Sequence, residues 1–97
     1  MGRLQPDYSD DTVIITGGAS GIGRAVAQQF GDAGATVLIG DLGPEPKIGD
    51  VPTHEAIREA GGEAAFVETD VSDRDQIRSL VEAARDYGGV DGMINNA

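Results

Sequence analysis

Cysteine is absent from this 97-residue chain, and lysine occurs once, at Lys47. Without cysteine, disulfides and thiolate-based metal or redox centres are excluded. No apolar run approaches the roughly 18 residues that a membrane-spanning helix needs. The polar start of the chain also lacks the apolar stretch of a signal peptide. These absences predict a cytoplasmic protein without a membrane partner. The spacing of histidine, aspartate and glutamate predicts no metal site.

The charge balance is strongly acidic, because 17 aspartates and glutamates face seven lysines and arginines, for a net charge of −10. Such a surface repels nucleic acid and anionic membranes at long range, so we expect neither as a partner. Two interpretations stay open. The chain is an ordinary acidic protein, or it is adapted to a salty cytoplasm, where dense carboxylates keep the surface hydrated. Unfolding measured against KCl concentration separates them.

Short apolar runs alternate with helical patterns along the whole chain. Predicted strands cover residues 12–16, 36–40, 64–68 and 90–94. Between them, Ile22, Val26 and Phe30 mark the apolar face of one helix. A second helix is predicted from Thr53, its cap, to about Ala60, and a third begins at a Ser72 cap. Alternating strands and helices predict an α/β fold with a doubly wound parallel sheet and right-handed Rossmann-type βαβ units.

A glycine-rich turn, Thr16 to Gly23, joins the first predicted strand to the first helix. Gly17 permits the tight turn, Gly21 lets the backbone approach a pyrophosphate, and Gly23 permits close helix packing. The helix N-terminus offers N–H groups and a positive dipole end to phosphates, and Ser20 adds a hydroxyl. A Walker-type loop is excluded, because no Gly-Lys-Ser/Thr follows. The turn therefore predicts a dinucleotide site.

The cofactor is predicted from Asp41, which ends the second strand about 20 residues past the glycines. A carboxylate there accepts hydrogen bonds from the adenosine ribose and repels a 2′-phosphate. No lysine or arginine occupies positions 40 and 42 or the residue before Gly21. NAD is therefore favoured over NADP.

The run Thr-Gly-Gly-Ala-Ser-Gly-Ile-Gly at 16–23 resembles the cofactor loop of the short-chain dehydrogenase/reductase family. Asp41 matches that family's NAD-selecting acid, and Asp70-Val71 matches its adenine contact. Asn95-Asn96-Ala97 matches the start of its Asn-Asn-Ala-Gly motif. The resemblance extends from about residue 10 to the end of the chain.

The resemblance implies a role for each matched position. Asp70 would receive the adenine amino group, and the Val71 N–H would meet a ring nitrogen. Asn96 and the Ala97 backbone would line the cofactor near its ribose, whereas Asn95 would brace neighbouring strands. The predicted cofactor ligands are Gly17, Ser20, Gly21, Ile22, Gly23, Asp41, Asp70, Val71 and Asn96.

The family's catalytic Ser and Tyr-x-x-x-Lys lie beyond the Asn-Asn-Ala-Gly motif and have no counterpart here. Four residues after Tyr8 and Tyr87 stand Thr12 and Asp91, and no tyrosine lies four residues before Lys47. We therefore predict no catalytic residue in this chain. Residues 1–97 are interpreted as the N-terminal part of one NAD-binding Rossmann domain, with 1–10 a flexible or edge segment, and are expected to be inactive alone.

The leading hypothesis is a short-chain NAD-dependent oxidoreductase that moves hydride between nicotinamide and an alcohol or carbonyl substrate. By kinship the intact protein is expected to be a homo-oligomer. The alternatives are a non-catalytic dinucleotide-binding module and a different Rossmann enzyme, such as a methyltransferase. His54 is predicted to be a solvated surface residue. Arg24 is expected to point to solvent, with a phosphate contact as the alternative.

Overall fold

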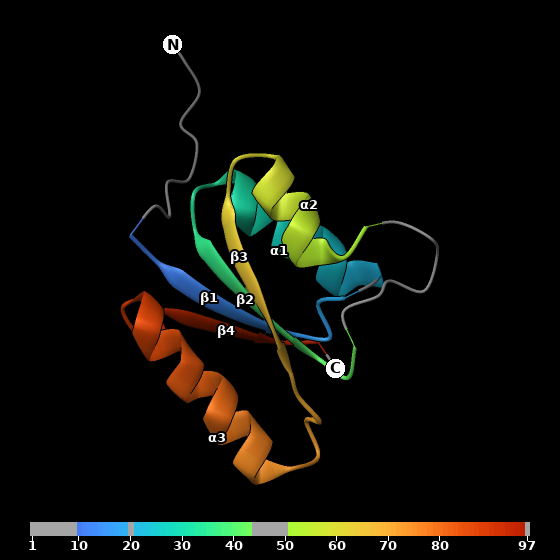
Figure 1. Ribbon diagram of the computed structural model, residues 1–97, viewed down its shortest axis with the longest axis vertical. Helices are drawn as coiled ribbons and strands as arrows, with labels where there is room; N and C mark the ends of the chain where they lie inside the picture. Colours follow the sequence, from blue (N-terminus) through green and yellow to red (C-terminus); the bar gives the residue numbers. More distant parts are fainter. Residues whose placement is uncertain (1–9, 20, 44–50, 97) are drawn as a thin grey trace.

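The computed structural model describes residues 10–19, 21–43 and 51–96, and its elements follow one another in a regular βαβ order (Figure 1). Residues 1–9 of the predicted segment 1–10, Ser20, most of the loop after the second strand and Ala97 lie outside the described residues. The elements are β1 (Thr12–Thr16), α1 (Gly21–Asp32), β2 (Thr36–Asp41), α2 (Thr53–Glu59), β3 (Glu63–Glu68), α3 (Arg74–Ala83), the 3₁₀ helix η1 (Ala84–Tyr87) and β4 (Gly92–Asn95).

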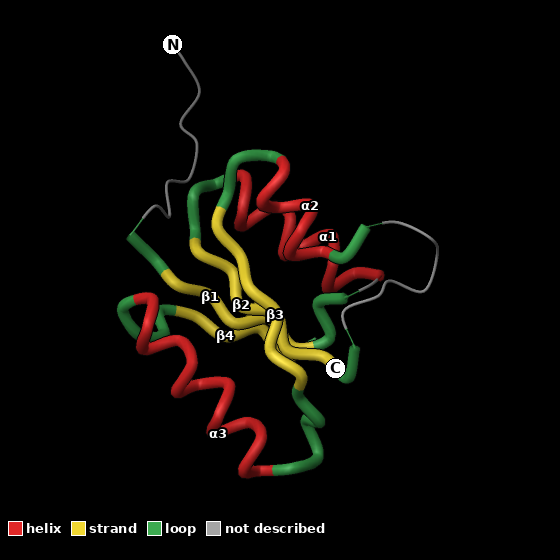
Figure 2. Tube along the Cα trace, in the orientation of Figure 1, coloured by secondary structure: helices red, strands yellow, loops and turns green. Residues whose placement is uncertain are grey.

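The four strands form one parallel sheet in the order β3-β2-β1-β4. Helices α1 and α2 cover one face and α3 covers the other, so the molecule has three layers (Figure 2). The chain runs outward from β1 through β2 to β3 and then returns to the other side of β1 to form β4, so the switch point lies between β1 and β4. Ligands in such sheets bind at the carboxyl ends of the strands beside this switch point. The predicted doubly wound α/β fold is confirmed.

The core has two halves because successive strand residues point to opposite faces. Ile15 belongs to the cluster beneath α1 and α2, whereas its neighbour Ile14 packs against Leu80 of α3. All five residues of β1 are buried, as a central parallel strand requires. Ile22 departs from the predicted apolar face, because its side chain is 76% exposed while Val26 and Phe30 pack on the core.

The predicted start of the fourth strand and two predicted helix caps are wrong. The fourth strand begins at Gly92, not at residue 90. Asp73, not Ser72, caps α3, since its Oδ1 accepts hydrogen bonds from the N–H groups of the next residues, 2.9 Å from Asp75 and 3.4 Å from Gln76. Thr53 is the first residue of α2 and its hydroxyl caps nothing. No helix within the described ranges is long and apolar enough to cross a bilayer.

Candidate dinucleotide site

The glycine turn leaves β1 and enters α1 through two residues in the left-handed backbone region. Gly17 has φ 69° and Gly21 has φ 63°. A side chain at such a φ costs about 1–2 kcal/mol, which explains glycine at both positions. The Gly17 N–H donates to the carbonyl oxygen of Gly40 at 2.8 Å, so the turn begins tied to β2. The predicted tight turn is therefore present.

Gly21 and Gly23 lack a side chain for different reasons. A Cβ on Gly21 would have no heavy atom within 4 Å, so this glycine faces open space at the N-terminus of α1. A Cβ on Gly23 would lie 2.2 Å from the Gly17 carbonyl oxygen and 2.6 Å from Nδ2 of Asn96. Gly23 thus permits close packing of α1 against the turn itself. Gly21 leaves room for an anion where helix N–H groups lack intrahelical partners.

Asp41 ends β2 directly beside this turn. Its Oδ2 accepts the Ala19 N–H at 3.1 Å, and its Oδ1 accepts the Leu42 N–H at 2.8 Å. The residue is half-buried. A carboxylate has about four lone-pair sites, so each oxygen can accept a further hydrogen bond. The fold therefore joins the glycine turn and the predicted ribose acid by a direct hydrogen bond.

Asp70 and Val71 follow β3 and lie next to the end of β2, because the Thr69 N–H donates to the Asp41 carbonyl oxygen at 2.8 Å. Ser72 donates to Asp70 Oδ1 twice, from its hydroxyl at 2.6 Å and from its backbone N–H at 2.9 Å. These hydrogen bonds lower the pKa of the Asp70 carboxyl below its usual value. Val71 is 41% exposed. Oδ1 of Asp70 is thus occupied by the two hydrogen bonds from Ser72.

The two asparagines after β4 reach back to β1 and the turn. The Thr16 hydroxyl donates to Asn95 Oδ1 at 2.8 Å, which joins the ends of neighbouring strands. The Asn96 N–H donates to Thr16 Oγ1 at 3.1 Å, and its side-chain Nδ2 donates to the Gly17 carbonyl oxygen at 3.3 Å. Asn95 therefore braces the strands, and Asn96 contacts the glycine turn.

Two residues outside the predicted site differ from expectation. His54 is not a solvated residue: its side chain is 16% exposed, and its ring stacks on Phe66 at a centroid distance of 6.0 Å. Burial lowers the pKa of His54, with a smaller effect in the same direction from the Arg58 charge. Arg24 does not point freely to solvent, since its Nη1 donates to the Val51 carbonyl oxygen at 2.7 Å. Sequence patterns gave no signal for either contact, because each joins different elements.

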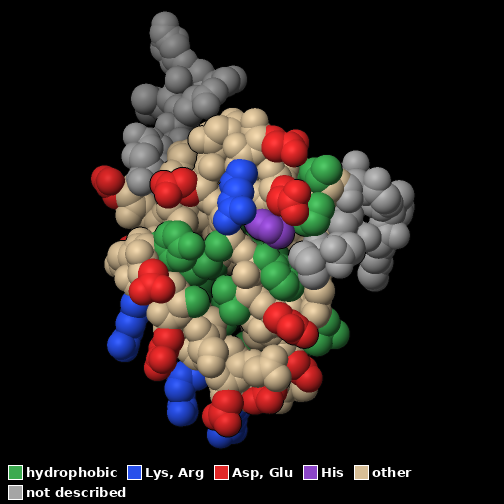
Figure 3. Space-filling view, viewed as in Figure 1, with side chains coloured by type: hydrophobic (Ala, Val, Ile, Leu, Met, Phe, Trp, Pro, Cys, Tyr) green, Lys and Arg blue, Asp and Glu red, His purple; other side chains and the backbone are tan. Residues whose placement is uncertain are grey.

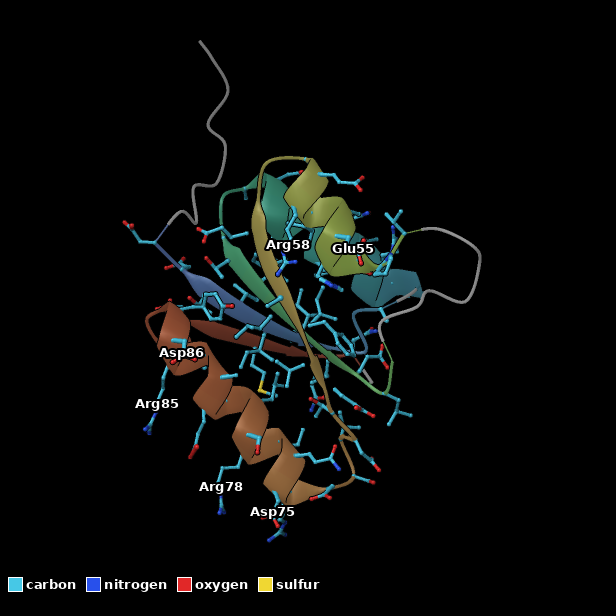
Figure 4. The ribbon with its side chains drawn as sticks, in the orientation of Figure 1. Glu55, Arg58, Asp75, Arg78, Arg85 and Asp86 are labelled. Atoms are coloured by element: carbon cyan, nitrogen blue, oxygen red, sulfur yellow. The ribbon has the colours of Figure 1, made fainter. Side chains whose placement is uncertain are left out.

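None of the hydrogen bonds described for the arginines goes to Asp41. Arg58 reaches from α2 over β3, where its Nε donates to the Ala64 carbonyl oxygen at 2.8 Å, whereas Arg78 of α3 and Arg85 of η1 point away from the sheet (Figure 4). Within the described ranges no arginine forms an ion pair with Asp41. Acidic side chains are spread over the face that carries α2 and α3 (Figure 3).

The predicted ligands therefore come together at the carboxyl ends of the strands, except that Ser20 is not described. Gly17, Gly21 and Gly23 form one turn, Asp41 bonds to it, and Asn96 contacts it from β4. The residues fit a dinucleotide, because a helix N-terminus with an open glycine suits a pyrophosphate and a neighbouring carboxylate suits a ribose diol. The described residues contain no group of three or more histidines, aspartates or glutamates placed to hold a metal ion.

Comparison with known proteins gives consistent results. A family model described as short chain dehydrogenase matches residues 11–97. An uncharacterized oxidoreductase of Thermotoga maritima is 40% identical over 85 residues, which cover 87% of this chain and 32% of the relative. 3beta-hydroxysteroid dehydrogenase 2 of Eggerthella lenta is 38% identical over 96 residues, which cover 98% of this chain and 36% of that protein.

Solved structures agree with the sequence matches. The crystal structure of a hydroxysteroid dehydrogenase from Escherichia coli has a TM-score of 0.82 and 30% identity, covering 94% of this chain and 38% of that chain. A short chain dehydrogenase from Mycobacterium avium has a TM-score of 0.82 and 33% identity, covering 96% and 35%. The chain spans about a third of the length of the curated relatives it matches. The predicted resemblance is confirmed, and the chain belongs to the short-chain dehydrogenase family.

Proposed function

We propose that this chain supplies the cofactor-binding part of an NAD-dependent oxidoreductase that acts on an alcohol or carbonyl group. The hydrogen bond between Asp41 Oδ2 and the Ala19 N–H carries the proposal. It places a carboxylate beside the turn whose Gly21 faces open space. A bound dinucleotide would then meet N–H groups at its pyrophosphate and an acceptor at its ribose.

Asp41 is the basis for choosing NAD over NADP. The 2′-hydroxyl of NAD can donate to a carboxylate, whereas the 2′-phosphate of NADP is an anion that the carboxylate repels. The neighbouring Leu42 carries no compensating charge. Arg24 and Arg58 donate to the carbonyl oxygens of Val51 and Ala64, and the other described arginines lie on α3 and η1.

The remaining predicted ligands have assigned tasks in this proposal. Oδ2 of Asp70 accepts a hydrogen bond from the adenine amino group, because Oδ1 already accepts two hydrogen bonds from Ser72. The Val71 N–H meets a ring nitrogen of the adenine, and Asn96, bonded to Gly17, lines the cofactor near its ribose. The backbone from Gly21 to Gly23, together with Ser20, holds the pyrophosphate.

When bound, NAD supplies a nicotinamide ring that accepts or returns a hydride. No serine and Tyr-x-x-x-Lys set occurs in these 97 residues, so residues 1–97 alone are expected to transfer no hydride. The relatives named above include hydroxysteroid dehydrogenases, which favours an alcohol or ketone substrate for the full-length protein. The proposed activity belongs to that full-length protein.

Calorimetric titration of NAD and NADP into the purified protein tests the cofactor assignment. Wild type is expected to bind NAD more tightly. Asp41→Ala removes hydrogen bonds from ribose to a charged acceptor, so NAD affinity should fall at least about tenfold while NADP affinity rises or holds. Asp32→Ala is the matched control, because this exposed acid lies at the opposite end of α1. A wild-type preference for NADP, or no binding of either nucleotide, would sink the proposal.

A further inference from the structure

The hydroxyl of Thr53, the first residue of α2, points to the glycine turn instead of capping its own helix. Its Oγ1 lies 3.1 Å from the Ala19 carbonyl oxygen and 3.1 Å from Nη1 of Arg24. The same Nη1 donates to the Val51 carbonyl oxygen at 2.7 Å. Thr53 is 1% exposed, and its hydrogen bond to Ala19 is buried. These contacts join α1, α2 and the glycine turn at one point.

The chemistry of the partners decides which way the Thr53 hydroxyl points. A guanidinium has only donors, and a carbonyl oxygen has only acceptor sites. Thr53 must therefore accept from Arg24 and donate its own proton to Ala19. The hydrogen bond from a cation strengthens the next one in the chain, because hydrogen bonds in series polarise one another. Arg24 thereby orients the hydroxyl that binds the turn.

Ala19 is consequently held on both sides. Asp41 accepts its N–H at 3.1 Å, and Thr53 donates to its carbonyl oxygen at 3.1 Å. Ala19 itself is 3% exposed, so no solvent replaces either partner. Both clamping side chains come from the ends of the β2–α2 connection, whereas the glycines on either side of Ala19, Gly17 and Gly21, permit many backbone conformations.

We propose that Thr53, oriented by Arg24, is a positioning residue that holds the glycine turn in the conformation that receives the cofactor's pyrophosphate. This inference rests on the proposed function, because it assigns the pyrophosphate to that turn. The hydrogen bonds of the Thr53 side chain go to Ala19 and Arg24, and not to Asp41 or the segment after β3. Asp41 also keeps its own hydrogen bond to the Leu42 N–H, so we expect the main effect of Thr53 on the phosphate part of the ligand. Arg24 acts through Thr53 and not on the phosphate directly.

Titration of ADP and adenosine separates positioning from general damage to the site. Thr53→Val keeps the side-chain volume and removes the hydroxyl, so ADP affinity should fall roughly tenfold while adenosine affinity stays within about twofold. Thr53→Ser retains the hydroxyl and should bind both as wild type does. Thr12→Val is the matched control, since Thr12 is also buried and donates to a carbonyl, that of Tyr87, at the other end of β1.

Arg24→Met provides an independent variant should Thr53→Val fail to fold. Alone it should weaken ADP and spare adenosine, with Arg78→Met of α3 as the control that changes neither. In a Thr53→Val background, Arg24→Met should weaken ADP no further, because its hydroxyl target is gone. An equal loss of ADP affinity in both backgrounds would show that Arg24 acts on the phosphate directly. It would overturn the proposal that Arg24 acts by orienting the Thr53 hydroxyl.

The outcomes distinguish this inference from the proposed function. If wild type binds ADP but Thr53→Val binds it equally well, the positioning role is wrong and the cofactor assignment stands. If Thr53→Val loses ADP and adenosine to the same extent, Thr53 supports the whole site and the inference is also overturned. If wild type binds neither ADP nor NAD, the proposed function itself fails.

Discussion

Replacing Gly23 by alanine is expected to destabilise the fold, because α1 lies too close to the glycine turn to accept a methyl group. The added Cβ would lie 2.2 Å from the Gly17 carbonyl oxygen, 2.9 Å from the Gly17 carbonyl carbon and 2.6 Å from Nδ2 of Asn96. The amide of Asn96 is an end group that can turn away. The Gly17 carbonyl belongs to the backbone, which is held in place by the hydrogen bond from the Gly17 N–H to the Gly40 carbonyl oxygen at 2.8 Å. The helix must therefore shift.

The size of the effect follows from two opposing terms. Forcing a methyl group into a packed site costs up to about 3 kcal/mol. Alanine recovers about 1 kcal/mol relative to glycine inside a helix. The free energy of unfolding should therefore fall by about 2 kcal/mol, which lowers the melting temperature by roughly 8–16 °C for a domain of this size. Gly23 is buried within α1, so no solvent-facing rearrangement relieves the clash.

Thermal unfolding followed by circular dichroism measures this loss. Gly43→Ala is the matched control, because a Cβ there meets nothing within 4 Å, and its stability should stay within about 0.5 kcal/mol of wild type. Adding Asn96→Ala to Gly23→Ala removes only the clash with the Asn96 side chain and leaves the clash with the Gly17 backbone. Most of the loss in unfolding free energy should therefore remain. Equal melting temperatures for Gly23→Ala and Gly43→Ala would refute the argument, and full rescue by Asn96→Ala would place the clash elsewhere.

Two further predictions concern the helices that flank the sheet. Burial lowers the pKa of His54 below 6.5, so the unfolded chain binds this proton more readily than the folded chain does. The free energy of unfolding should therefore rise with pH between the lowered pKa and 6.5. His54→Gln should flatten this part of a plot of unfolding free energy against pH, whereas an unchanged slope contradicts the assignment. Asp73→Ala should cost about 1 kcal/mol, because Asp73 caps α3, and Ser72→Ala should cost less; equivalent urea midpoints for the two variants would show that Asp73 is not the cap.

Local sequence patterns predicted the structure correctly where one physical requirement dominates a short segment. The β-branched run of β1 predicts a strand buried on both faces, and all five of its residues are buried. Gly17 predicts a tight turn out of β1, and the structure has that turn, with φ 69° at Gly17. Helix ends were less predictable. Ser72 and Asp73 can each cap a helix, and the choice depended on Ser72 bonding to Asp70 instead.

The amino-acid sequence by itself determined the alternation of strands and helices, the glycine turn and the acid that ends β2, because each depends on neighbours within a few residues. Only the tertiary structure decided what these parts contact. The Thr53 hydroxyl meets Ala19 across 34 residues, and the Asn96 amide meets Gly17 across 79. Such pairs carry no periodic signal, since parallel crossovers bring them together through the sheet order and not through spacing.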